Sequence, residues 1–173
     1  MENFSADLLL RWIHFLSGIT WIGLLYYFNI VQVPALADAA KDTGGPGPTA
    51  ISKYIAPRAL WWFRWGAVVT WLSGAALLAH RGIFVDAFAL GLNTENPSVY
   101  VVAIGVGAWL GTIMLLNVWG LIWRNQKKVL GIVAATDDEK ARAKRVAFLA
   151  SRTNVLLSVA MLLFMGASHG LLF

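Results

Sequence analysis

Four long apolar segments constrain what this chain of 173 residues can fold into. Each exceeds the roughly 18 apolar residues that mark a helix able to cross a membrane. The first two contain one charged residue each and the last two contain none. A helix of a soluble bundle would need a polar face, which these segments lack. The sequence therefore predicts a single all-α membrane domain, residues 1–173, with four transmembrane helices in a bundle, over residues 8–33, 59–79, 99–123 and 153–173.

The basic residues predict which side of the membrane each connection occupies. The connections at residues 34–58 and 124–152 hold 11 of the 14 Lys and Arg residues. Cytoplasmic connections collect basic residues, so we expect both of these in the cytoplasm and both termini outside. This asymmetry explains the basic composition without a nucleic-acid partner. The acidic start and the length of the first segment favour a retained membrane helix over a cleaved signal peptide.

Histidine is the residue type that points to chemistry. The chain has no cysteine, which excludes disulfides, thiolate metal sites, iron–sulfur clusters and covalently attached c-type haem. Its three histidines, His14, His80 and His169, all fall toward the outer side of the predicted bundle. His14 lies roughly 9 Å into the first helix, and His169 lies roughly 6 Å from the end of the last. An ionisable residue inside a membrane segment is a functional candidate by default.

Two neutral imidazoles at similar depth in a helical bundle suit haem b. We predict that His14 and His169 are the axial ligands of the haem iron, with His80 as a weaker candidate. Three neighbours are expected to line the same pocket: Gly18, Trp21 and Ser168. Two alternatives stay open. The His14 ring can be a packed residue bonded to backbone, or it can hold copper or zinc with a third ligand such as His80.

Two further features allow more than one interpretation. Gly107 and Gly111 form a G-x-x-x-G pattern, which favours close helix packing and also offers a face for a homo-oligomer. Arg64 lies in the segment LWWFRW, where it can snorkel among interfacial tryptophans or bind an anion or a haem propionate. We expect Arg64 to pair with lipid headgroups or with amides at the cytoplasmic level: Asn29, Gln32, Asn117 or Asn154.

Segments from all four helices together resemble a known family. LLLRWIHFLSGITWIGLLYYF, LWWFRWGAVVTWLSGAALL, NVWGLIWRNQKKVLG and RTNVLLSVAMLLFMGASHG are similar, in this order, to the transmembrane region of the bacterial membrane-bound urate hydroxylases. The matching motif positions are His14, Trp21, Arg64, Trp71, Asn117, Gln126, Lys127, Asn154 and His169. Members that oxidise urate have about eight spans followed by a c-type cytochrome domain. This chain resembles only their N-terminal half and has no C-x-x-C-H motif.

The resemblance implies an oxidoreductase of the bacterial inner membrane. We expect a redox module that holds haem b near the outer leaflet and passes electrons to a separate c-type cytochrome or a larger membrane complex. One alternative is a non-catalytic accessory subunit of such a complex. Another is a protoporphyrinogen oxidase of the HemJ type, because those small four-helix proteins also begin with a histidine and a tryptophan on the first helix.

Overall fold

The computed structural model describes residues 2–96 and 98–166 of the chain. Helices and their short connections account for all of this described part, and it contains no strand. Along the chain the elements are α1 (Glu2–Tyr26), η1 (Tyr27–Gln32), α2 (Val33–Lys41), η2 (Ile51–Ile55), α3 (Ala56–His80), α4 (Phe84–Phe88), α5 (Val99–Asn117), η3 (Val118–Trp123), α6 (Arg124–Val129) and α7 (Asp137–Gly166), where η marks a π-helical segment.

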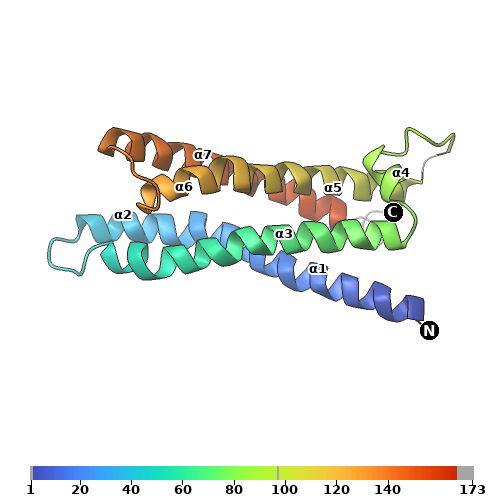
Figure 1. Ribbon diagram of the computed structural model, residues 1–173, viewed down its shortest axis with the longest axis horizontal. Helices are drawn as coiled ribbons and strands as arrows, with labels where there is room; N and C mark the ends of the chain where they lie inside the picture. Colours follow the sequence, from blue (N-terminus) through green and yellow to red (C-terminus); the bar gives the residue numbers. More distant parts are fainter. Residues whose placement is uncertain (1, 97, 167–173) are drawn as a thin grey trace.

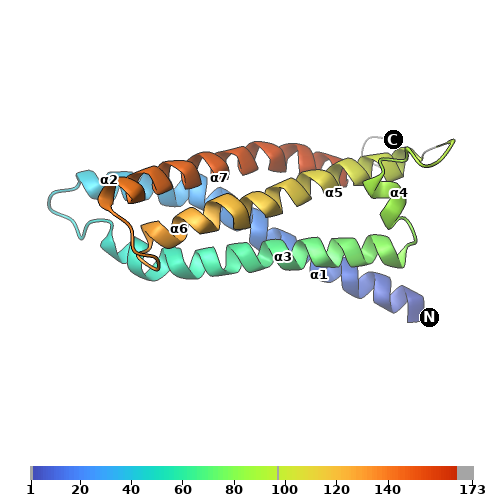
Figure 2. The same ribbon diagram turned by 45° about the horizontal axis from the view of Figure 1, so that its top comes forward.

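The helices form a long antiparallel bundle (Figures 1 and 2). The chain runs along the rod through α1 and α2, returns through α3, runs out again through α5 and α6, and returns through α7. Helix α1 packs along α3, and α5 packs along α7. The N-terminus and α4 lie at one end of the rod, which we call the α4 end. The tip of α2, α6 and the start of α7 lie at the other, which we call the basic end.

π-Helical turns join some helices into longer continuous helices, and proline explains two of these turns. Pro34 is at the start of α2, directly after η1, and Pro57 is at the start of α3, directly after η2. Proline has no N–H and its ring crowds the carbonyl four residues earlier, so a regular α-helical turn is disfavoured there. A π-helical turn widens the backbone at that point and lets the helix continue. The first helical stretch, made of α1, η1 and α2, thereby runs without interruption from Glu2 to Lys41.

Helix α7 begins sixteen residues before the last membrane span that the sequence predicts. The connection predicted over residues 124–152 is mostly helical, because α6 and the first half of α7 occupy it. A reciprocal cap fixes the start: the Glu139 amide donates to Thr136 Oγ1 at 3.3 Å, and the Thr136 amide donates to Glu139 Oε2 at 2.9 Å. This T-x-x-E arrangement satisfies backbone donors that a helix start leaves free. The predicted connection over residues 34–58 is likewise shortened by α2 and η2.

Three helical stretches are long and apolar enough to cross a membrane: Ser5–Lys41, Val99–Val129 and Asp137–Gly166. The sequence analysis expected four, and the difference is α3. This helix has 25 residues, which is sufficient length, but it carries Arg64 and four tryptophans that lower its mean hydropathy. The predicted last span, 153–173, falls within α7 as far as Gly166, and its remainder lies outside the described residues.

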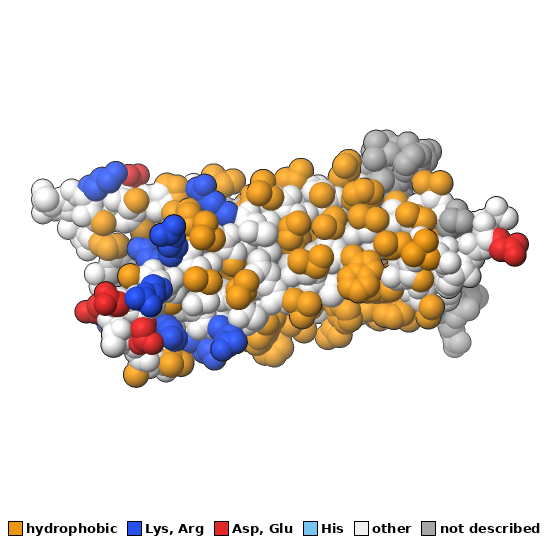
Figure 3. Space-filling model, turned by 90° about the horizontal axis from the view of Figure 1, so that it is seen from above, with side chains coloured by type: hydrophobic (Ala, Val, Ile, Leu, Met, Phe, Trp, Pro, Cys, Tyr) orange, Lys and Arg blue, Asp and Glu red, His pale blue; other side chains and the backbone are white. Residues whose placement is uncertain are grey.

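The surface separates apolar from basic side chains along the rod (Figure 3). Large hydrophobic side chains cover the middle of the rod and the part near α4, while Lys and Arg gather at the basic end. Ile19 is 71% exposed and Leu156 is 75% exposed, each surrounded by further exposed apolar residues. An apolar belt of this extent marks a surface that lipid or protein covers. The structure is therefore compatible with a multi-pass membrane protein.

The interior combines a hydrophobic cluster with one buried amide network. Trp21, Leu25, Phe63, Met114 and Val118 are almost wholly buried and bring α1, α3, α5 and η3 together.

Asn154 of α7 is the centre of the amide network. It is fully buried, accepts a hydrogen bond from Asn117 Nδ2 at 2.7 Å and donates to the Met114 carbonyl at 3.1 Å. Asn117 also donates to the Ala150 carbonyl at 2.9 Å. These bonds tie α5 to α7 at mid-length.

Replacing Asn154 by alanine tests this network. We expect Asn154→Ala to lower the free energy of unfolding by about 1–3 kcal/mol, because the Asn117 amide loses an acceptor inside the bundle. Thermal unfolding of the purified protein measures the loss. Thr153→Ala is the matched control, since Thr153 is exposed and bonds only within its own helix. An equal effect of the two substitutions would contradict the assigned role of Asn154.

Candidate functional site

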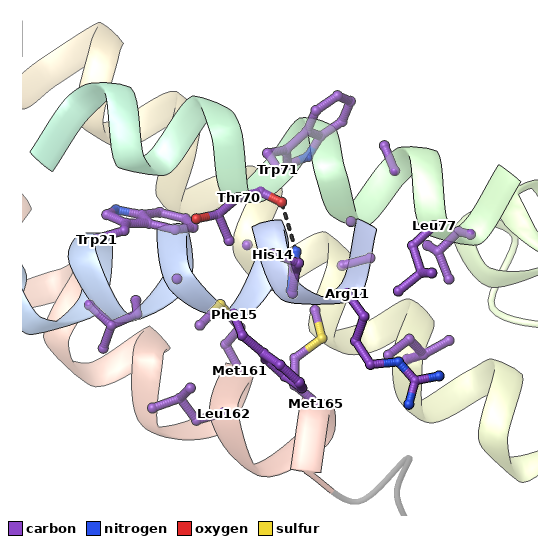
Figure 4. A pocket seen from close by; sticks show the side chains of 18 of the residues that line it. Arg11, His14, Phe15, Trp21, Thr70, Trp71, Leu77, Met161, Leu162 and Met165 are labelled. Carbon is purple, nitrogen blue, oxygen red and sulfur yellow. Dashed lines mark hydrogen bonds between the residues drawn. The ribbon is translucent and has the colours of Figure 1, made fainter. Parts of the chain in front are cut away.

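A cavity of about 580 Å³ opens between the helices toward the α4 end of the bundle (Figure 4). Residues from α1, α3, α5 and α7 form its walls, and Phe88 of α4 contributes as well. The lining is predominantly apolar, with a few polar and charged groups among the hydrophobic side chains. Small-molecule and cofactor sites have volumes of roughly 300–1,000 Å³ and this kind of lining. The cavity is therefore the first candidate for a binding site.

His14 lies in the wall of this cavity in a defined orientation. Its Nδ1 atom is 2.8 Å from the backbone carbonyl of Thr70 on α3. A carbonyl oxygen only accepts hydrogen bonds, so Nδ1 carries the proton and Nε2 keeps its lone pair. Figure 4 shows the ring reaching from α1 toward α3. A histidine held in this way by a carbonyl is oriented as metal-ligating histidines are in proteins.

Gly74 makes the space that the imidazole occupies. A Cβ atom at position 74 would lie 2.9 Å from His14 Cε1 and 3.0 Å from His14 Nδ1. Atoms do not pack this closely, so any side chain at position 74 would displace the ring or separate α1 from α3.

The structure brings three of the predicted pocket residues together, since His14, Gly18 and Trp21 all line the cavity. Trp21 is 1% exposed, and its Nε1 donor is buried without a hydrogen-bond partner. His80 is the last residue of α3, is exposed and does not line the cavity. The predicted residues Ser168 and His169 lie outside the described residues.

Two methionines of α7 line the cavity and were missed by the sequence analysis. Figure 4 places Met161 and Met165 across the cavity from α3. A Cβ atom at Gly107 would be 3.1 Å from Met165 Cε, and one at Gly111 would be 3.6 Å from Met161 Sδ. The G-x-x-x-G face of α5 thus packs on α7 within one chain. The M-x-x-x-M spacing on α7 matches it and was readable from the sequence.

Two arginines and one aspartate stand at the part of the cavity nearest the N-terminus. Arg11 donates to the Asp7 carboxylate at 2.8 Å, and Arg81 Nε donates to the same carboxylate at 2.8 Å. Arg81 also donates to the Tyr100 hydroxyl at 2.9 Å, and its hydrogen bond to Asp7 raises the pKa of its guanidinium. Two positive charges share one negative charge, so this group has a net charge of +1. The Nε of Arg11 is buried without a hydrogen-bond partner.

Carboxylates and histidines do not gather elsewhere in a way that suggests a metal site. Within residues 2–96 and 98–166, no group of three His, Asp or Glu side chains is close enough to hold an ion. The copper or zinc alternative with His80 as third ligand also needs His169, which lies outside the described residues, so it stays a prediction.

Among the described residues, Arg64 does not pair with the amides that the sequence analysis expected, and pairing with lipid headgroups stays a prediction. Its Cζ lies 3.6 Å from the centroid of the Trp123 ring, and its Nε and Nη1 are buried without hydrogen-bond partners. Three of the four expected amides have other partners. Asn29 donates to Leu25 and Ser151, Asn117 donates to Ala150 and Asn154, and Asn154 donates to Met114.

Gly74→Ala tests the packing of the imidazole. We expect it to lower the free energy of unfolding by about 1–3 kcal/mol through overpacking. Gly18→Ala is the matched control, because a Cβ there would lie 3.7 Å from Thr70 Cγ2, an ordinary contact. Adding His14→Ala to Gly74→Ala should restore part of the lost stability in a double-mutant cycle followed by thermal unfolding. Independent, additive effects of the two substitutions would refute the contact.

Comparison with known proteins identifies a family for the segment that contains α1 and α3. A family model described as urate oxidase N-terminal matches residues 3–90, which include both His14 and the segment of α3 against which its ring packs. No curated protein and no solved structure matches the chain. Because the family model covers half of the chain, the protein belongs to the urate oxidase N-terminal family.

Proposed function

We propose that the protein is a four-span membrane redox module that holds haem b in the cavity and transfers electrons to a separate cytochrome. The observation that carries the proposal is the orientation of His14 in the wall of a largely apolar cavity of about 580 Å³. Its Nδ1–H donates to the Thr70 carbonyl, which leaves Nε2 with its lone pair. The family match supports a relation to urate-oxidising proteins. We assign the protein to the bacterial inner membrane because of the resemblance described above.

The path of the chain supports α3 as the fourth span. Helix α1 starts at the α4 end of the rod and α5 starts at the same end (Figure 1). If α1 and α5 both cross the membrane in one direction, the chain must cross back between them, and α3 is the segment that does so. The Lys and Arg residues gathered at the basic end favour a cytoplasmic position for that end. The cavity and both termini would then face the outer leaflet.

The cavity residues fit haem in three respects. His14 offers a neutral imidazole nitrogen, which is the usual axial ligand of haem iron. The apolar walls suit the macrocycle, and the surplus positive charge of Arg11 and Arg81 suits the propionate carboxylates. His14 would hold the haem together with His169, as the sequence predicts, or with a thioether sulfur of Met161 or Met165.

The chain's own residues define what the site would do. Bound haem supplies an iron that gains and loses one electron. The Thr70 carbonyl holds the His14 proton on Nδ1, which fixes the ring and increases the basicity of Nε2. The apolar walls exclude water, and Arg11 lines the cavity with an unpaired donor that can bind a carboxylate. Urate itself is a polar anion with many hydrogen-bonding groups, so we assign this apolar cavity to the cofactor and not to urate.

One observation also favours an accessory subunit as the second candidate. A hydrogen bond from His14 to Thr70 satisfies a purely structural histidine equally well. In that case the protein would assemble with a catalytic partner and bind no cofactor. The protoporphyrinogen oxidase alternative stays a prediction.

An absorbance spectrum distinguishes the two candidates. The purified protein, produced with a haem precursor supplied, should show Soret and α bands in a reduced-minus-oxidised difference spectrum. His14→Ala should remove at least about nine-tenths of the bound haem, because the iron loses its oriented ligand. His80→Ala is the control and should retain the spectrum, since His80 does not line the cavity. A flat spectrum from the unmodified protein would favour the accessory subunit.

The lack of native cysteine allows a direct test of the four-span topology. Thr43→Cys and Glu95→Cys place single thiols at exposed positions in the connections before and after α3. In whole cells, a membrane-impermeant maleimide should label Cys at position 95 and not at position 43. Labelling of both residues, or of neither without permeabilisation, would mean that α3 does not cross the membrane.

A further inference from the structure

Arg64 lies on a platform of tryptophan rings toward the basic end of the bundle. Its guanidinium Cζ is 3.6 Å from the centroid of Trp123 and 5.8 Å from the centroid of Trp119. Trp119 in turn packs edge-on against Trp65, with 5.5 Å between their centroids. A planar guanidinium stacked in this way is held in one orientation, which a lysine ammonium could not match.

Three donors on this platform have no acceptor. Arg64 Nε, Arg64 Nη1 and Trp119 Nε1 are buried without hydrogen-bond partners. A buried donor without a partner costs about 1–3 kcal/mol, more where the group is charged, so three around one cation indicate a missing acceptor. The salt bridges that the structure describes join Asp7, Asp137 and Glu139 to other basic residues and leave Arg64 without a carboxylate.

The surroundings of Arg64 identify what would supply that acceptor. Trp61 and Trp62 of the same helix are 46% and 59% exposed, and exposed tryptophans of a membrane protein gather where hydrocarbon meets headgroups. Arg124 directly follows Trp123, and Arg58 lies about 9 Å before Arg64 along α3. Tryptophan rings followed by basic side chains toward the helix end are typical of a membrane interface. At this level the abundant anion is a lipid phosphate.

We propose that Arg64, Trp119 and Trp123 form a binding site for the phosphate of an anionic phospholipid of the inner leaflet. The phosphate oxygens accept from the Arg64 guanidinium and from Trp119 Nε1, and the acyl chains lie along the exposed apolar surface of α3 and η3. This inference rests on the membrane placement of the proposed function and is independent of haem. It differs from simple snorkelling because the stacked rings orient the cation toward one bound lipid.

Native mass spectrometry of the detergent-purified protein, titrated with phosphatidylglycerol, tests the site. Arg64→Gln should weaken binding of the first lipid about tenfold, since a hydrogen bond to a charged group is lost. Arg64→Lys and Trp123→Leu should also weaken it, because each removes the stacked geometry. Arg152→Gln is the matched control: its guanidinium lies 4.7 Å from the Phe148 ring on the exposed surface, and its loss should leave the first affinity unchanged.

Each other outcome would overturn the proposal. Unchanged binding by Arg64→Gln, or equal losses in Arg64→Gln and Arg152→Gln, would reduce the effect to surface charge. Inorganic phosphate that displaces the lipid at equal concentration would make this a site for a soluble anion. If Arg64→Gln does not fold, Arg64→Lys and Trp123→Leu decide, with circular dichroism as the check on their helix content. A protein that stays soluble without detergent would instead refute the membrane placement and leave the proposed site without its lipid.

Discussion

The hydrogen bond from His14 to the Thr70 carbonyl is the interaction on which the arrangement of the cavity depends. It joins α1 to α3, and it forms only because Gly74 leaves room for the ring. The bond fixes the proton on one nitrogen and leaves the other with its lone pair. A single glycine on one helix and a single histidine on another thus set both the spacing of the two helices and the chemistry available in the wall between them.

The two halves of the bundle serve different purposes. Around Asn154 and toward the basic end, polar groups and large side chains fill the interior, and Asn154 bonds both to Asn117 and to a backbone carbonyl. Toward α4 the helices leave a cavity that side chains do not fill. A bundle can leave such space only where its stability is secured elsewhere, since an empty apolar volume loses packing energy. The amide network and the cluster around Trp21 therefore support the part of the molecule that stays open.

The sequence predicted the helices well and their ends poorly. Apolar runs locate the membrane-compatible helices because hydrophobicity is a property of the residues themselves. The predicted last span begins at residue 153, sixteen residues after the start of α7 at Asp137, because the charged segment between them was assigned to a connection. Helix α3 was expected to match the other spans, but Arg64 and its tryptophans make it less apolar. His14, Gly18 and Trp21, which the sequence analysis expected in one pocket, all line the cavity. The M-x-x-x-M spacing on α7 could be read from the sequence, but its place in the wall of the cavity depends on contacts between helices. The stacking of Arg64 on Trp123 depends on such a contact as well.

The continuous helical stretch from Glu2 to Lys41 has a mechanical consequence. At 1.5 Å per residue it is about 60 Å long, roughly twice the thickness of the hydrocarbon core of a bilayer. In the proposed membrane placement, tilting alone would not contain a helix of this length in lipid, and a stalk of several turns would project beyond it. The backbone stays helical through the wide turn before Pro34, so the stalk continues directly into α1. A displacement of the stalk would therefore reach His14 through the helix itself.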